Sequence, residues 1–110
     1  MEKVLRGDII YPGTAKGEPV IIDELTNDVN PDEIKGKIGI IKRLSMEHAH
    51  FISHLKGAVS IGGSLLSHIA IMAREYGVPA VRVGEDVDPN LFREFEIVEI
   101  KQDIVVLGGR

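Results

Sequence analysis

The chain has 110 residues, of which 44% are hydrophobic and 27% charged, and its formal net charge at pH 7 is −4. That length and apolar content predict one domain with a core of its own and exclude intrinsic disorder. The acidic balance argues against a nucleic-acid partner, no apolar run approaches the roughly 20 residues of a membrane helix, and the first residues do not form a signal peptide.

The first third of the chain predicts short strands separated by turns. The apolar residues 9–10 are followed by Tyr-Pro-Gly, which ends the run. The apolar residues 20–22 predict a short buried strand. Residues 23–37 are mostly polar and hold turn residues, so this segment predicts a loop with one helical turn at most. Residues 38–41 predict the next strand.

A helix is predicted over residues 46–55, with Ser45 as its N-cap. A strand is predicted to follow at residues 58–61. The helix prediction rests on an apolar stripe at helical spacing, formed by Met46, Ala49, Ile52 and Leu55.

Residues 64–76 carry the clearest helical pattern of the chain. Gly77 follows where a left-handed C-cap belongs, and Pro79 prevents continuation. The apolar face of this helix consists of Leu65, Leu66, Ile69, Met72, Ala73 and Tyr76.

The last quarter predicts a strand at 80–83, a short helical turn from Asp88-Pro89 to residue 95, and a closing hairpin of residues 97–100 and 104–107. The sum is a single mixed α/β domain over residues 1–110, with short strands and two or three helices.

The segment that carries chemistry is the glycine turn and the helix that follows it. Gly62 and Gly63 permit a sharp turn and the close approach of another molecule. A helix N-terminus offers free N–H groups to an anion, and Ser64 and Ser67 add hydroxyl donors. A ring nitrogen of His68 is a nucleophile when unprotonated. A phosphoryl group carried on His68 would therefore rest above an anion site formed by these residues.

A plainer interpretation of the same spacing stays open. Glycine-to-helix turns are common, so His68 could be an ordinary helix residue and the serines ordinary caps. Arg74 likewise has two interpretations, either an approach to the phosphate or a partner, or a cation that complements the helix C-terminus.

The segment resembles the phosphohistidine signature of the phosphoenolpyruvate-utilising enzymes, in the domain called mobile or swivelling. Relatives in that family include pyruvate phosphate dikinase, phosphoenolpyruvate synthase, enzyme I of the sugar phosphotransferase system and the rifampicin phosphotransferases. The residues that fit the signature are Ser67, His68, Ala70, Ala73, Arg74, Gly77, Val78, Pro79, Ala80 and Val81.

The resemblance extends over essentially the whole chain. Arg6-Gly7, residues 12–17 and the strand at 20–22 look like the usual opening of such domains, and residues 45–47 lie where the family often has a turn. Two positions depart from the signature, since Ser64 replaces its second glycine and Leu66 stands where dikinases and enzyme I carry threonine. The resemblance implies a swivelling β/β/α phosphohistidine fold in which His68 is the phosphorylated residue.

What the resemblance implies for function is a phosphocarrier that moves a phosphoryl group between partner active sites. The expected partners are an ATP-binding domain, a barrel that binds phosphoenolpyruvate or pyruvate, or both, because 110 residues contain neither. No cofactor is expected on this chain, and magnesium would come with ATP or phosphoenolpyruvate on the partner. The absence of cysteine fits a cytoplasmic location.

Two further hypotheses compete with the carrier. One is a noncatalytic interaction or regulatory module that keeps the fold but transfers nothing, and the other is a part of a larger enzyme. A metal pair of His50 and His54 near Glu47 is conceivable on an α-helix, but His48 would point away from His50. Surface or partly buried histidines are the favoured interpretation, and no metal site is expected.

Overall fold

The computed structural model describes residues 2–24, 29–63 and 66–109. Its first half contains the strands β1 (Lys3–Arg6), β2 (Asp8–Tyr11), β3 (Thr14–Gly17), β4 (Pro19–Asp23) and β5 (Ile38–Arg43), with the short helix α1 (Pro31–Ile34) before β5. Its second half contains the 3₁₀-helix η1 (Met46–His54), β6 (Gly57–Ile61), α2 (Leu66–Tyr76), β7 (Ala80–Val83), the 3₁₀-helix η2 (Pro89–Glu94), β8 (Ile97–Lys101) and β9 (Ile104–Gly108).

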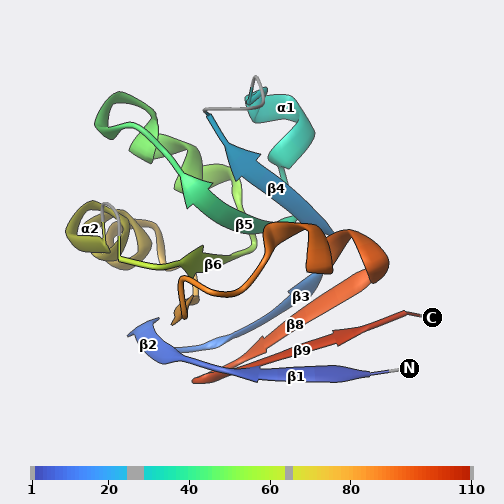
Figure 1. The fold of residues 1–110 in the computed structure, drawn as a ribbon. Coiled ribbons are helices and arrows are strands. Elements are labelled where there is room, and N and C mark those ends of the chain that lie inside the picture. The colour runs from blue at the N-terminus through green and yellow to red at the C-terminus, as the bar shows by residue number, and fades with distance from the viewer. Residues whose placement is uncertain (1, 25–28, 64–65, 110) are drawn as a thin grey trace.

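The strands form two sheets that lie face to face (Figure 1). An antiparallel sheet has the order β1-β9-β8-β3, and a mixed sheet has the order β2-β7-β6-β5-β4. Within the mixed sheet β4, β5, β6 and β7 are parallel, and β2 is antiparallel to β7. The helices α1, η1 and α2 cover the other face of the mixed sheet, so the predicted β/β/α layering is confirmed.

Two apolar cores lie on opposite faces of the mixed sheet, because successive residues of a strand point to opposite sides. Ile41 belongs to the core under the helices, whereas Ile40 belongs to the core between the sheets. This double burial explains why residues 38–41 are apolar without alternation. Among the described residues, no helix is long and apolar enough to cross a membrane.

Most predicted elements are confirmed, and one helix end is resolved in detail. Gly77 has a φ of +66°, and the N–H of Val78 donates to the carbonyl of Ala73 over 2.9 Å. That bond is the six-to-one bond of a Schellman cap, as the glycine and the following proline predict. The predicted helix start at residues 64 and 65 lies outside the described residues.

Three expectations were wrong in detail. The segment predicted as a helix over 46–55 is a 3₁₀-helix over Met46–His54; Ser45 is its N-cap, as predicted, but makes no capping hydrogen bond with its side chain. Ala49, Ile52 and Leu55 of the predicted apolar stripe are buried, but Met46 is 63% exposed. Tyr76 was expected on the apolar face of α2, but it is exposed at the end of the helix.

The two sheets pack closely against each other at Gly57, and this contact is testable. A Cβ there would lie 2.9 Å from both Ala15 Cβ and Ile100 Cδ1. We expect Gly57→Ala to lower the free energy of unfolding by about 1–3 kcal/mol, because extra volume in a packed interior forces strain. Urea denaturation measures the change.

Gly108→Ala provides the matched control, since the nearest atom to a Cβ at that position, Glu2 Cγ, is 3.8 Å away. Equal stability of the two variants would show that the sheets are not in contact at Gly57.

Candidate functional site

The candidate site lies at the edge of the mixed sheet where the parallel strands end. The last residues of β4, β5, β6 and β7 are Asp23, Arg43, Ile61 and Val83. Since the strands run in the same direction, these carboxyl ends meet at one edge, which is where open α/β sheets place ligands. The turn from β6 into α2 starts at this edge.

The turn at the end of β6 depends on Gly62. Its φ is +80°, a region that side chains disfavour, and its N–H donates to the carbonyl of Val83 over 2.9 Å. A Cβ on Gly62 would lie 2.8 Å from Cγ of Glu85, whereas Gly63 is exposed and has open space beside it. The N–H of Leu66 then donates to the carbonyl of Gly63 over 3.3 Å. Of the two glycines, Gly62 therefore meets the geometric requirement of the turn, whereas Gly63 leaves open space beside it.

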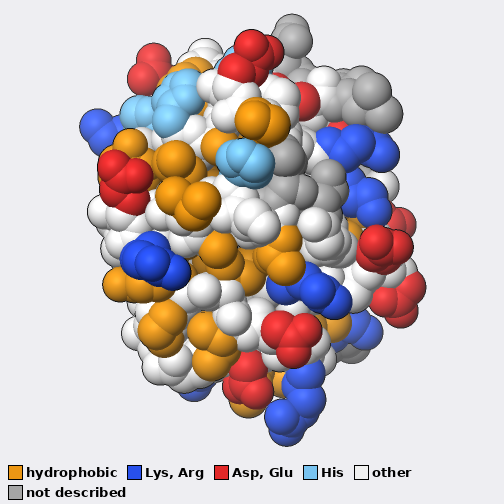
Figure 2. Space-filling view, turned by 90° about the vertical axis from the view of Figure 1, so that its left-hand side faces the viewer, with side chains coloured by type: hydrophobic (Ala, Val, Ile, Leu, Met, Phe, Trp, Pro, Cys, Tyr) orange, Lys and Arg blue, Asp and Glu red, His pale blue; other side chains and the backbone are white. Residues whose placement is uncertain are grey.

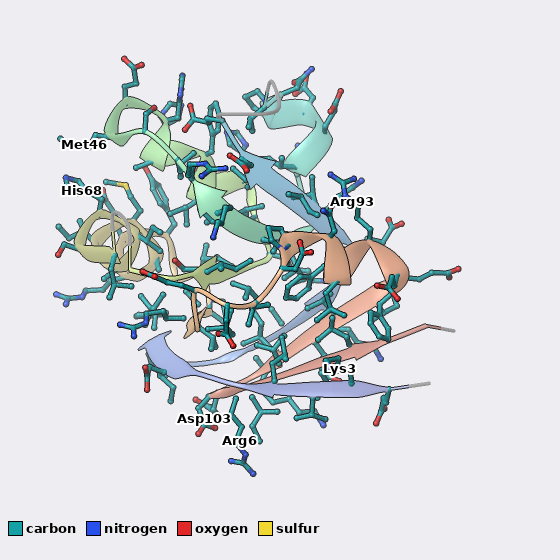
Figure 3. All side chains as sticks on the ribbon, in the orientation of Figure 1. Lys3, Arg6, Met46, His68, Arg93 and Asp103 are labelled. Atoms are coloured by element: carbon teal, nitrogen blue, oxygen red, sulfur yellow. The ribbon has the colours of Figure 1, made fainter. Side chains whose placement is uncertain are left out.

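His68 occupies the first turn of α2, where backbone N–H groups have no partner within the helix. Its neighbour Ile69 is buried in the core, Ser67 is exposed, and His68 itself is partly buried. Figure 3 shows His68 and Met46 projecting on the same side of the molecule, from the starts of α2 and η1. The ring is therefore reachable from solvent and lies near the amide-rich end of its helix. Ser64 lies outside the described residues.

Arg74 is exposed in the last turn of α2, six residues beyond His68. Six residues correspond to about 9 Å along the axis and place the two side chains on different sides of the helix. This position suits a cation that complements the helix C-terminus. An accessory role in phosphate binding stays a prediction.

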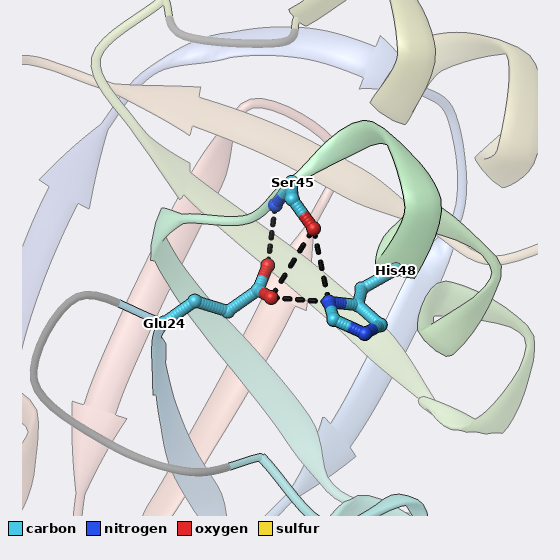
Figure 4. Close-up of polar contacts among 3 residues, drawn as sticks. All are labelled: Glu24, Ser45 and His48. Atoms are coloured by element: carbon cyan, nitrogen blue, oxygen red, sulfur yellow. Dashed lines mark hydrogen bonds and ion pairs between the residues drawn. The ribbon is translucent and has the colours of Figure 1, made fainter.

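A polar cluster that sequence reasoning missed lies at the ends of β4 and β5 (Figure 4). Glu24 accepts hydrogen bonds from the N–H and the hydroxyl of Ser45, the latter over 3.2 Å, and also contacts Nδ1 of His48. The hydroxyl of Ser45 is 2.9 Å from the same Nδ1. A carboxylate beside Nδ1 favours the tautomer with its proton on that atom, which leaves Nε2 as the acceptor. The cluster ties the start of η1 to the end of β4.

An ion pair lies beside this cluster. The Nε and Nη2 atoms of Arg43 donate to the two carboxylate oxygens of Asp23 over 2.9 and 3.0 Å. These hydrogen bonds raise the pKa of the Arg43 guanidinium above its ordinary value, against a smaller opposing effect of desolvation. Arg43 and Lys42 also line an open pocket of about 370 Å³ together with Ile61, Gly62, Gly63 and Glu85.

The remaining histidines do not form the metal pair considered from the sequence. In a 3₁₀-helix residues three apart are eclipsed, so His50 and His54, four apart, point in different directions. His48 instead stacks on Phe51 at a centroid distance of 5.0 Å. The part of the chain that the structure describes contains no group of three or more His, Cys, Asp or Glu side chains arranged for a metal.

The face formed by α2 and η1 carries histidines and exposed apolar side chains together (Figure 2). The exposed apolar residues on these two elements are Met46, Ile71 and Tyr76. His68 and Ile71 are three residues apart and therefore neighbours along the helix surface.

The family model described as "PEP-utilising enzyme, mobile domain" matches residues 33–109. Chondramide synthase cmdD of Chondromyces crocatus is 33% identical over 99 residues, which is 90% of this chain. This chain spans only 2% of the length of that synthase.

Two solved structures share the fold. The solution NMR structure of a UPF0107 protein has a TM-score of 0.65 at 15% identity, and the holo form of aconitase X from Thermococcus kodakaraensis has a TM-score of 0.64 at 21% identity. Both alignments cover 96% of this chain and 98% of the other. At these identities the likeness concerns the fold alone.

The two glycines of the turn should respond differently to alanine. Gly62→Ala should lower the free energy of unfolding by at least about 1–2 kcal/mol, because a left-handed backbone is costly for a side chain and Glu85 must also move. Gly63→Ala should leave thermal unfolding nearly unchanged, since open space surrounds that position. A larger loss for Gly63→Ala in calorimetry would contradict the described turn.

Proposed function

This chain belongs to the family of PEP-utilising enzyme mobile domains, and we propose that it carries a phosphoryl group on His68 between the active sites of partner domains. The observation that carries the proposal is the position of the ring. By the resemblance of residues 67–81 to the family signature, His68 corresponds to the phosphohistidine, and it is partly exposed in the first turn of α2, directly after a glycine turn. A carrier residue needs both a route to its donor and groups that stabilise negative oxygens.

The proposed step is an in-line transfer to Nε2 of the neutral imidazole. The nitrogen lone pair forms the P–N bond while the bond between phosphorus and the bridging oxygen of the donor breaks, and the leaving oxygen takes that electron pair. Such transfers need positioning and charge stabilisation more than covalent help from the protein. The hydroxyl of Ser67 and the backbone N–H groups in the first turn of α2 would supply both. Gly63, with no atoms near its open side, leaves room for the donor.

The proposed partners supply what this domain does not contain. Domains of this family work within multi-domain PEP-utilising enzymes. We infer an ATP-binding domain, a phosphoenolpyruvate- or pyruvate-binding barrel, or both, as donor and acceptor. Magnesium would arrive with the ATP or phosphoenolpyruvate of the partner, and the cytoplasm, where both compounds are made and used, is the inferred location.

One observation favours a second candidate, a noncatalytic interaction module. Leu66 offers no hydroxyl at the position where dikinases carry threonine, so one polar anchor for the phosphate is absent. The same fold without transfer would then present the α2 and η1 face to a partner.

Phosphorylation in the presence of partners separates the two candidates. After incubation with cell extract and either ATP or phosphoenolpyruvate, intact-mass spectrometry should show the gain of one phosphoryl group that is labile to acid and stable to base. His68→Ala should abolish the gain and leave the circular dichroism melt nearly unchanged. His50→Ala, which removes an exposed histidine of η1, is the matched control and should keep the gain. A label that persists in His68→Ala would reject the site.

The anion-stabilising role of Ser67 has its own test. Ser67→Ala should slow phosphorylation of His68 about tenfold, the effect of losing one hydrogen bond to a charged group. Ser53→Ala is the control, because the hydroxyl of that exposed serine on η1 donates to the carbonyl of His50 and faces no phosphate in this account. Rates measured by quenched mass spectrometry that are equal for Ser67→Ala and the unchanged chain would remove Ser67 from the site.

A further inference from the structure

The strand β4 forms one edge of the mixed sheet, and no strand of the described residues lies on its outer side. In a parallel pair, every second residue of a strand directs both its N–H and its C=O to the same neighbouring strand, and the residues between direct theirs to the opposite side. The N–H of Ile38 donates to the carbonyl of Glu18 over 2.8 Å, so Glu18, Val20 and Ile22 face β5. Pro19 and Ile21 therefore direct their backbone groups to the open side.

Ile21 presents both a donor and an acceptor on that side, while Pro19 has no N–H to offer. Among the described residues, no backbone group of a helix or loop hydrogen-bonds to Ile21 there. A free donor and a free acceptor on an edge strand are a template for another extended chain.

A cavity of about 320 Å³ lies over this edge, between α1 and η2. Its two sides differ, because α1 covers the helix face of the sheet and η2 the opposite face. On the α1 side it is lined by Val20, Val29, Ile34 and Glu33. On the η2 side it is lined by Ile21, Phe92 and Arg93.

Arg93 gives the η2 side a positive charge. Its Nε donates to Oδ1 of Asn90 over 2.9 Å, which orients the guanidinium and leaves the Nη groups for other acceptors. Figure 3 places Arg93 beside the outer edge of β4, between η2 and α1. Glu33 is exposed on the α1 side, so an acidic side chain is favoured on the η2 side only.

We propose that the edge of β4 binds an extended peptide segment of a partner protein, which adds a strand to the mixed sheet beside Ile21. Side chains of an extended segment alternate between the two faces of a sheet. The segment that fits has apolar side chains toward α1 and acidic side chains toward Arg93. Backbone hydrogen bonds to Ile21 supply affinity, and the alternation of apolar and acidic residues supplies specificity. This surface is separate from the His68 face, and the inference does not rest on phosphoryl transfer.

The probe for this inference is the blocked peptide acetyl-Val-Glu-Val-Glu-Val-Glu-amide, followed by amide shifts in two-dimensional ¹H–¹⁵N NMR of the full chain. The amides of Ile21 and Arg93 should shift on titration. The same peptide with lysine in place of glutamate should bind about tenfold more weakly, as expected for the loss of a charge-assisted pair. A version methylated on its backbone nitrogens should cause no shift at Ile21.

Two variants make the test decisive. Arg93→Glu should reverse the preference toward the lysine peptide, whereas Arg6→Glu, an equal change of charge on exposed β1, should not.

Ile21→Pro removes the outward N–H without removing a ladder bond, because proline is tolerated where the N–H faces away from the sheet. It should weaken binding about tenfold relative to Ile21→Val.

The inference fails if the acidic peptide shifts only residues of α2 and η1, if no amide shifts at all, or if Arg93→Glu keeps the original preference. His68→Ala should bind the peptide like the unchanged chain. A failure of peptide binding would leave the phosphorylation result untouched, and the reverse also holds.

Discussion

The candidate site depends on the parallel direction of β4 to β7. Each crossover between these strands carries one helix, and the helices α1, η1 and α2 pack on the same face. All four strand ends therefore meet at one edge, and the segments that follow them lie close together there. If the helix after β6 did not start at this edge, His68 would not lie in its exposed first turn. The left-handed backbone of Gly62 is the local feature that makes this start sharp.

The antiparallel sheet packs on the face of the mixed sheet that the helices leave uncovered. The mixed sheet is therefore buried on both faces. Apolar residues such as Ile38, Ile40 and Val59 fill the space between the two sheets. Chemistry is therefore confined to the strand ends and the strand edges, where polar groups reach solvent. The strand ends carry His68 and the Glu24–Ser45–His48 cluster, and the outer edge of β4 carries the cavity beside Arg93. Because β4 and β2 are opposite edges of the sheet and α2 contacts β2, the two surfaces lie apart from each other.

Much of the fold could be predicted because burial and turns leave local signals. The apolar run at residues 38–41 and the Gly77–Pro79 helix end needed no information from distant residues. The strands β1 and β3 were missed, since Lys3–Arg6 is mostly exposed, Thr14–Gly17 is half exposed, and both become strands only by pairing with β9 and β8. The 3₁₀ form of η1 was missed because its apolar residues fit a helical period of either kind. For the site, the signature located His68, but nothing local indicated that Glu24 meets Ser45 and His48 across the parallel strands.

The central claim is that one imidazole, at the start of α2, accepts and releases the phosphoryl group. The measurement that tests it most directly is a long-range ¹H–¹⁵N NMR spectrum of the four histidine rings, recorded on the uniformly ¹⁵N-labelled chain before and after phosphorylation. The account predicts that, of the four rings, only that of His68 changes its nitrogen resonances, that its Nε2 gains a coupling to phosphorus, and that both changes disappear when the acceptor is added. A phosphorus coupling on His48, His50 or His54 in place of His68 would contradict it.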